Sequence, residues 1–129
     1  MADWVVRAGE ARPLDLFKGY GRHILVPTLF GFSVQYAPGL TPPATVDDLA
    51  RAGRFKNGQI SYQYDQVLIT AVTSLGYQAR LIKSPGGGFH HTFAVLYTAN
   101  GTMIQKLPQD AADALSSAFL RRPNPYQVP

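Results

Sequence analysis

The stretch SPGGGFHHTFAVLY, residues 84–97, places three consecutive glycines and two adjacent histidines before an apolar, β-branched run. Residues 90–97 therefore predict a strand, and the glycines predict a permissive loop suited to close approach of a ligand. Because side chains alternate along a strand, His91 and His90 point to opposite faces, and Thr92 shares the face of His90. Only one of the two histidines can face a given cleft.

Outward from this stretch, further segments predict an antiparallel sheet. Asn100-Gly101 predicts a hairpin turn into a strand at 103–106. Residues 80–83 predict the strand that precedes the glycine loop. Short apolar or alternating runs predict three more strands, at residues 3–9, 29–39 and 58–64.

Four segments carry helix signals, at residues 12–21, 41–53, 65–75 and 108–120. Thr45 before two aspartates predicts a capped start, and Gly53 and Gly76 predict helix ends. One helical stripe is expected to pack on the sheet through Val67, Leu68, Ala71, Val72 and Leu75. Pro123 and Pro125 predict an extended tail over residues 121–129.

The chain has 129 residues and predicts a single α+β domain, a mainly antiparallel sheet with short helices packed on it. It contains no cysteine, which excludes disulfides and thiolate metal sites. A net charge of +4 favours an anionic partner or substrate. No apolar run has the length of a membrane span or signal peptide, so we expect no membrane partner. We also expect a monomer.

His91 is the leading candidate for acid–base chemistry, because imidazole titrates near neutrality. The alternative is a histidine at a strand entry that bonds only to the backbone. Adjacent strand histidines diverge, and the chain has a single glutamate, so we expect no metal. Gly87 and Gly88 would let a ligand approach the backbone.

Residues 58–82 (GQISYQYDQVLITAVTSLGYQARLI) followed by HHTFAVLY resemble the core of transglutaminase-like and papain-like hydrolases. In those enzymes a cysteine begins a helix, an LG-x-x-AR segment follows, and a strand histidine is the base. The resemblance puts Ser61 at the nucleophile position and His91 at the base position. Asp110 or Gln105 would be the third member.

Residues 5–19 (VVRAGEARPLDLFKG) resemble the opening of cholera-like ADP-ribosyltransferase toxins. The resemblance implies that Arg7 contacts NAD and that Ser33, in GFSVQ, stands for their central-strand serine. Those toxins also use a late glutamate. This chain has none after Glu10, so Asp110 or Gln109 would have to replace it.

Four segments between residues 31 and 125 resemble C-terminal toxin domains of bacterial polymorphic toxins of the Rhs and contact-dependent inhibition types. They are GFSVQYAPG, VDDLARAGRFKNGQIS, GGGFHHTF and LPQDAADALSSAFLRRPNP. The resemblance implies an antibacterial effector that a larger secreted parent chain delivers into the cytoplasm of a target cell. It also implies a cognate immunity protein.

Small toxin domains of this kind often cleave RNA without a metal, which needs a base, an acid and cations around the phosphate. His91 would be base or acid, Thr92 or Tyr62 would bond the phosphate, and Arg7 would neutralise it. Other candidate substrate contacts are Arg80, Lys83, Ser33, Ser61, Gly87 and Gly88. Seven tyrosines and seven phenylalanines offer surfaces for stacking bases.

We expect this domain to be an enzyme. Because the late glutamate is missing, a metal-independent ribonuclease without a cofactor is favoured over an ADP-ribosyltransferase that uses NAD. A hydrolase with Ser61 as nucleophile and a non-catalytic binding module remain alternatives.

Overall fold

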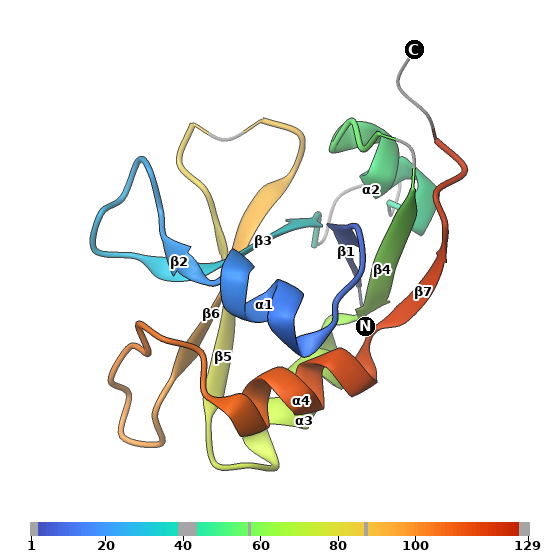
Figure 1. Cartoon of the computed structure of the whole chain (residues 1–129). Coiled ribbons are helices and arrows are strands. Elements are labelled where there is room, and N and C mark those ends of the chain that lie inside the picture. Colours follow the sequence, from blue (N-terminus) through green and yellow to red (C-terminus); the bar gives the residue numbers. More distant parts are fainter. Residues whose placement is uncertain (1–2, 39–43, 57, 87, 127–129) are drawn as a thin grey trace.

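The computed structural model describes residues 3–38, 44–56, 58–86 and 88–126. Within these residues it contains a seven-stranded sheet and four helices (Figure 1). The strands are β1 (Trp4–Ala8), β2 (Gly21–Arg22), β3 (Phe30–Tyr36), β4 (Gln59–Tyr64), β5 (Gln78–Lys83), β6 (His91–Tyr97) and β7 (Leu120–Pro123). Their order is β5-β6-β3-β1-β4-β7, every pairing is antiparallel, and β2 pairs with β3. The predicted α+β class is confirmed.

One edge of β3 is shared by two strands, and this splits the sheet. On that edge β1 pairs only at Val5↔Tyr36 and Val6↔Gln35, whereas β2 pairs farther along, at Gly21↔Gly31. Within the described chain, residues 32–34 have no strand partner on this edge. Figure 1 shows β5, β6 and β3 diverging from β1, β4 and β7. Polar side chains from the two halves can therefore meet at the split.

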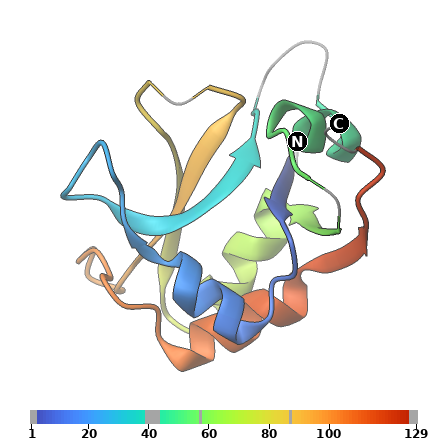
Figure 2. The ribbon, with the colours of Figure 1, turned by 45° about the horizontal axis from the view of Figure 1, so that its top comes forward.

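The helices cover both faces of the sheet. They are α1 (Pro13–Gly19), α2 (Val46–Ala52), α3 (Asp65–Thr73) and α4 (Gln109–Ala118). Helices α1, α3 and α4 pack on one face through Leu16, Leu68 and Leu115, and Figure 2 shows α1 (blue) and α4 (orange-red) side by side below the strands. Helix α2 covers the other face, where Leu49 packs against Ile60 of β4. None of the described helices is long and apolar enough to cross a membrane.

The predicted caps of α2 are confirmed. Thr45 Oγ1 accepts a hydrogen bond from the Asp48 backbone N–H at 3.1 Å, and Gly53 is the C-cap. Such a cap contributes about 1 kcal/mol. The packing predicted for the stripe on α3 is only partly correct. Leu68 and Val72 are buried, but Val67 and Leu75 are exposed. The face of the helix that contacts the sheet and α4 is narrower than the predicted stripe.

The strand predicted over 103–106 is wrong. The turn forms, with Gly101 at φ +90°, but only Met103 pairs, in an isolated bridge with Tyr97. Ile104 and Leu107 are buried in the core, so the chain turns inward before a ladder can extend. The extended conformation predicted for the tail is confirmed over residues 121–123, which belong to β7 and pair with β4, and residues 127–129 lie outside the described residues. The Asn124 side chain anchors the segment that follows by donating to two backbone carbonyls.

Candidate functional site

A pocket of about 490 Å³ lies beside the split in the sheet. Its polar lining comprises Ser33, Ser84, His23, His91, Lys18 and Arg22. Ile24, Leu25 and Phe93 supply apolar walls. The described residues that line it include two cations and no carboxylate, so the pocket suits an anionic ligand.

His91 is the first residue of β6, and it meets Ser33 from the neighbouring strand β3. Its Nε2 lies 2.9 Å from Ser33 Oγ, and Nδ1 has no hydrogen-bond partner among the described residues. Burial lowers the pKa of His91 below its usual value, and the nearby His23 lowers it further. The ring is therefore neutral at neutral pH and able to accept a proton.

His23 lies in the same pocket but is fully engaged by the protein. Its Nδ1 accepts the backbone N–H groups of Leu25 at 2.9 Å and Val26 at 3.2 Å. This arrangement requires an unprotonated Nδ1, so Nε2–H donates to Ser84 Oγ at 3.0 Å. His23 thus joins the β2–β3 loop to the start of the glycine loop, and neither of its ring nitrogens is free for catalysis.

Arg7 of β1 reaches the split beside this pocket. Its Nη1 donates to the Ser33 carbonyl at 3.1 Å and its Nη2 to the Asp15 carbonyl at 3.3 Å. Burial lowers the pKa of Arg7, and the Asp15 carboxylate partly opposes this. Gly19, which lines the pocket, gives the guanidinium room, because a Cβ there would lie 2.6 Å from Nη2. Arg7 and Ser33, which sequence reasoning placed in one site, do lie together.

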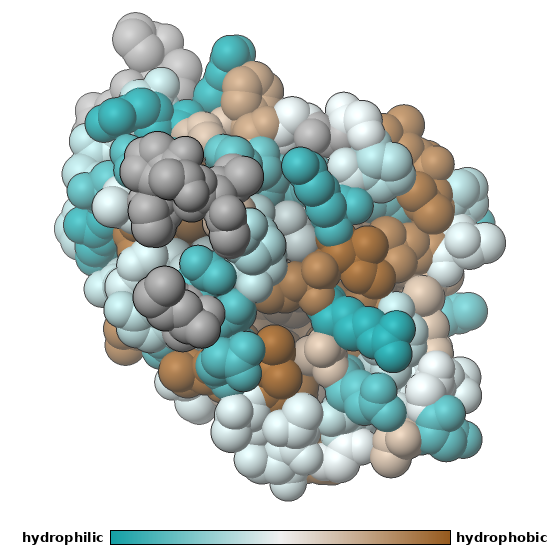
Figure 3. Space-filling view, turned by 180° about the vertical axis from the view of Figure 1, so that it is seen from behind, coloured by the Kyte–Doolittle hydropathy of each residue, from teal (hydrophilic) through white to brown (hydrophobic). Residues whose placement is uncertain are grey.

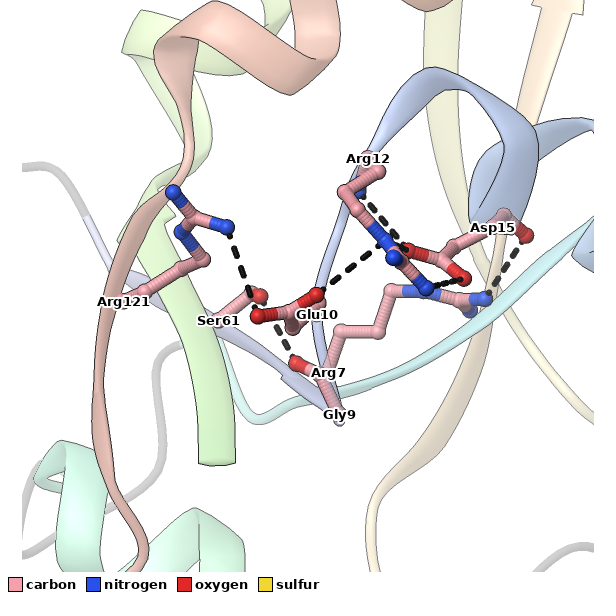
Figure 4. A network of polar contacts seen from close by, with 7 residues as sticks. All are labelled: Arg7, Gly9, Glu10, Arg12, Asp15, Ser61 and Arg121. Carbon is pink, nitrogen blue, oxygen red and sulfur yellow. Dashed lines mark hydrogen bonds and ion pairs between the residues drawn. The ribbon is translucent and has the colours of Figure 1, made fainter. Parts of the chain in front are cut away.

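The loop between β1 and α1 is fixed by the chain of ion pairs in Figure 4. Glu10 pairs with Arg12 at 3.1 Å and with Arg121 at 3.5 Å, and Arg12 pairs with Asp15 at 2.8 Å. The only glutamate of the chain is therefore committed to this loop and does not line the pocket.

The two substitutes considered for a late glutamate lie on α4. Asp110 accepts the Tyr77 hydroxyl at 2.8 Å, and Gln109 donates to Asp113 at 2.9 Å. Neither residue lines the pocket.

Ser61 and Tyr62 lie on β4, away from the pocket. Ser61 is fully buried in mid-strand, not at the start of a helix, and its Oγ donates to the Gly9 carbonyl at 2.8 Å (Figure 4). Tyr62 points to the opposite face, where Arg122 lies 5.6 Å from its ring centroid. The structure does not bring either residue to His91.

His90 and Thr92 line a separate hollow of about 140 Å³ together with Lys83, whereas His91 lines the larger pocket. The predicted divergence of the two histidines is confirmed. Arg80 is exposed, 4.9 Å from the Tyr97 ring centroid. Gly88 is exposed and lies three residues before His91, and Gly87 lies outside the described residues.

Sequence reasoning missed Lys18, Arg22, His23 and Ser84 as pocket residues. The signal available for His23 was its position as the third histidine, in GRHILVP just before a strand. His23 reaches the pocket only because the β2–β3 loop folds back over β6, where Leu29 packs on Phe93. In the described ranges, no group of three or more His, Asp or Glu side chains is placed to hold a metal.

Comparisons with protein-family models, with curated proteins and with solved structures find no significant match to this chain.

Proposed function

We propose that the domain cleaves the nicotinamide–ribose bond of NAD and transfers ADP-ribose. The observation that carries this proposal is that Ser33 and His91 meet in a pocket that the described residues line without a carboxylate, and that Arg7 bonds to Ser33 beside it. Two of the three, Arg7 and Ser33, are the residues that the resemblance to cholera-like toxins assigned to NAD. The third comes from β6, which pairs with β3.

Arg7 has the properties of a diphosphate ligand. Its two hydrogen bonds to backbone carbonyls hold the guanidinium in place, while Nε is buried and has no partner among the described residues. Each of the two Nη atoms carries two N–H groups, so one N–H on Nη1 and one on Nη2 remain for phosphate oxygens. Lys18 and Arg22 add positive charge at the pocket, and Phe93 offers an apolar wall for a flat ring.

The reaction fits a site with one free base. The C1′–N bond of NAD breaks with its electron pair going to the pyridinium nitrogen, so neutral nicotinamide leaves without a general acid. In the same step a nucleophile forms the new bond at C1′ and gives up a proton, which neutral His91 accepts, so loss of this base slows nicotinamide release as well. The Ser33 hydroxyl orients the His91 ring and faces the developing oxocarbenium charge with an oxygen.

RNA cleavage is the second candidate, favoured by the two histidines and two cations in the pocket. That reaction needs a base for the 2′-hydroxyl and an acid for the leaving 5′-oxygen. His91 can perform one of these roles, but both ring nitrogens of His23 already bond to the protein. The geometry therefore supports RNA cleavage less well than ADP-ribosyl transfer.

The biological role that we propose is that of an interbacterial toxin. A larger secreted parent chain would deliver the domain into the cytoplasm of a target cell, and a cognate immunity protein would protect the producer. The support is the resemblance over residues 31–125 together with the pocket that His91 and Ser33 line. Expression in a bacterial cytoplasm should stop growth, and the His91→Ala variant should restore it.

The decisive experiment incubates purified protein with NAD labelled in the adenylate phosphate and with total bacterial RNA and protein. We expect released nicotinamide and label on a macromolecule. Fragmented RNA with 2′,3′-cyclic phosphate ends, formed in EDTA without NAD, would instead establish the ribonuclease. If a folded preparation that arrests growth forms neither product, both reactions are refuted.

A further inference from the structure

The glycine loop ends in two non-glycine residues with left-handed backbone, immediately before the proposed base. Phe89 has φ +60° and His90 has φ +61°. Left-handed backbone is unfavourable for residues with a Cβ and recurs at functional sites, where the surrounding structure maintains it. Here it lies at the turn into β6, where His90 lines one cavity and His91 lines the other.

Phe89 is presented as an exposed ring with a cation against it. Its exposed fraction is 49%, and the Arg54 guanidinium carbon lies 4.3 Å from the ring centroid. Arg54 also has left-handed backbone, φ +52°, and makes no ion pair among the described residues. An exposed aromatic ring beside an unpaired arginine is the usual combination for stacking an unpaired base and holding its phosphate.

His90, the residue after Phe89, lines the smaller hollow, to which Lys83 gives a positive charge. Its polar lining is His90, Thr92, Lys83 and Tyr36. Tyr36 donates its hydroxyl to Asp65 at 2.6 Å, so the nearby carboxylate is already bonded and does not line the hollow. A volume of about 140 Å³ is enough for a phosphate group. On the rear face, hydrophobic side chains gather on the half that carries β5 and β6, and polar ones surround them (Figure 3).

We propose that Phe89, Arg54, Lys83 and His90 form the acceptor site, and that the acceptor is a single-stranded nucleic acid. One base stacks on Phe89 and an adjoining phosphate enters the hollow beside Lys83. The hollow and the larger pocket lie on opposite faces of β6 but at the same end of it, because His90 and His91 are adjacent at its start. The bound strand would pass around this end of β6 to reach the base that takes its proton. This inference rests on the proposed ADP-ribosyl transfer for its chemistry, but the binding site stands on its own contacts.

Binding is tested without catalysis, by fluorescence anisotropy of a fluorescein-labelled 12-nucleotide RNA and of the DNA of the same sequence. Phe89→Ala should weaken binding about tenfold because it removes the ring on which a base stacks, and Lys83→Ala should do the same because it removes the cation beside a phosphate. Lys106→Ala is the matched control, because it removes an exposed lysine from the segment between β6 and α4. Its affinity should stay within about twofold of the unsubstituted protein.

Loss of affinity in the first two variants alone would support the site, and the tighter of the two strands identifies the acceptor. Equal affinity in all three variants, or equal loss, would overturn it. In the labelled-NAD reaction, label on nucleic acid supports the inference and label confined to protein contradicts it. If no nicotinamide is released but the binding pattern holds, the proposed reaction fails and the nucleic-acid site stands.

Discussion

Two strand serines flank Arg7, and they differ in every property that matters for chemistry. Ser61 pairs directly with Arg7 across β1 and β4, in a ladder that runs the whole length of β1. Its hydroxyl is buried and donates to a backbone carbonyl. Ser33 lies on the other side of Arg7, where β1 has left β3, and its exposed hydroxyl meets His91.

The comparison separates the closed half of the sheet from the split edge. Where the ladder is complete, backbone groups bond to each other and a serine can only support the fold. Where β1 and β2 leave a gap on β3, the Ser33 carbonyl is satisfied by Arg7. A guanidinium, a hydroxyl and an imidazole are thereby held within reach of a pocket. We therefore expect the functional site to lie where β1 and β2 leave this gap on β3.

The largest effect should come from removing His91. Loss of a general base costs about a hundredfold to ten-thousandfold in rate, so His91→Ala should reduce nicotinamide release from NAD by that range. His91 is only partly buried, so the fold should survive, which circular dichroism and thermal melting would check.

His23→Ala is the comparison within the pocket. It leaves the backbone N–H groups of Leu25 and Val26 without their acceptor, so it should lower the melting temperature more than His91→Ala does. An active His91→Ala protein would refute the assignment of the base.

Arg7 should give the next largest effect. Arg7→Ala removes a partly buried cation whose Nη1 and Nη2 each keep one unused N–H, and such preorganised donors contribute about a hundredfold to a thousandfold in rate. Arg7→Lys keeps the charge but loses the planar fork, and it should recover only part of the activity. Arg121→Ala, on the closed side, removes an exposed ion pair with Glu10 and should leave the rate unchanged. Similar losses in steady-state assays of Arg7→Ala and Arg121→Ala would mean that the split edge has no special role.

Local sequence signals explain why the elements could be predicted and the pocket only in part. Thr45, Gly53 and the apolar, β-branched run over residues 91–97 act over a few residues, and the structure confirms the helix and the strand that they predicted. The strand at 103–106 failed because burial of Ile104 and Leu107 outweighed the hairpin signal. The place of His23 in the pocket was not predicted, because it depends on a contact with Ser84, which is 61 residues away in the chain. A single sequence carries no local trace of such a contact.

The pH dependence should reveal the neutral form of His91. Burial and His23 lower the pKa of His91, so protonation of the base begins only below the usual histidine value of about 6.5. Nicotinamide release should be constant from neutral to weakly alkaline pH. It should fall about tenfold per pH unit once the pH lies below the His91 pKa. A rate that rises on acidification would require a protonated histidine and would favour the ribonuclease.

The smallest effects should separate the two serines most cleanly. Ser33→Ala removes one hydrogen bond to His91 at an exposed position, so the rate should fall about twofold to tenfold with little change in stability. Ser61→Ala leaves the Gly9 carbonyl without its buried donor, so it should lower the free energy of unfolding by about 1–3 kcal/mol. The rate per folded molecule should stay the same in Ser61→Ala. Denaturant unfolding and nicotinamide release, measured on the same preparations, give both quantities. The reverse pattern, with Ser61→Ala stable but inactive, would move the nucleophile to β4 and restore the hydrolase interpretation.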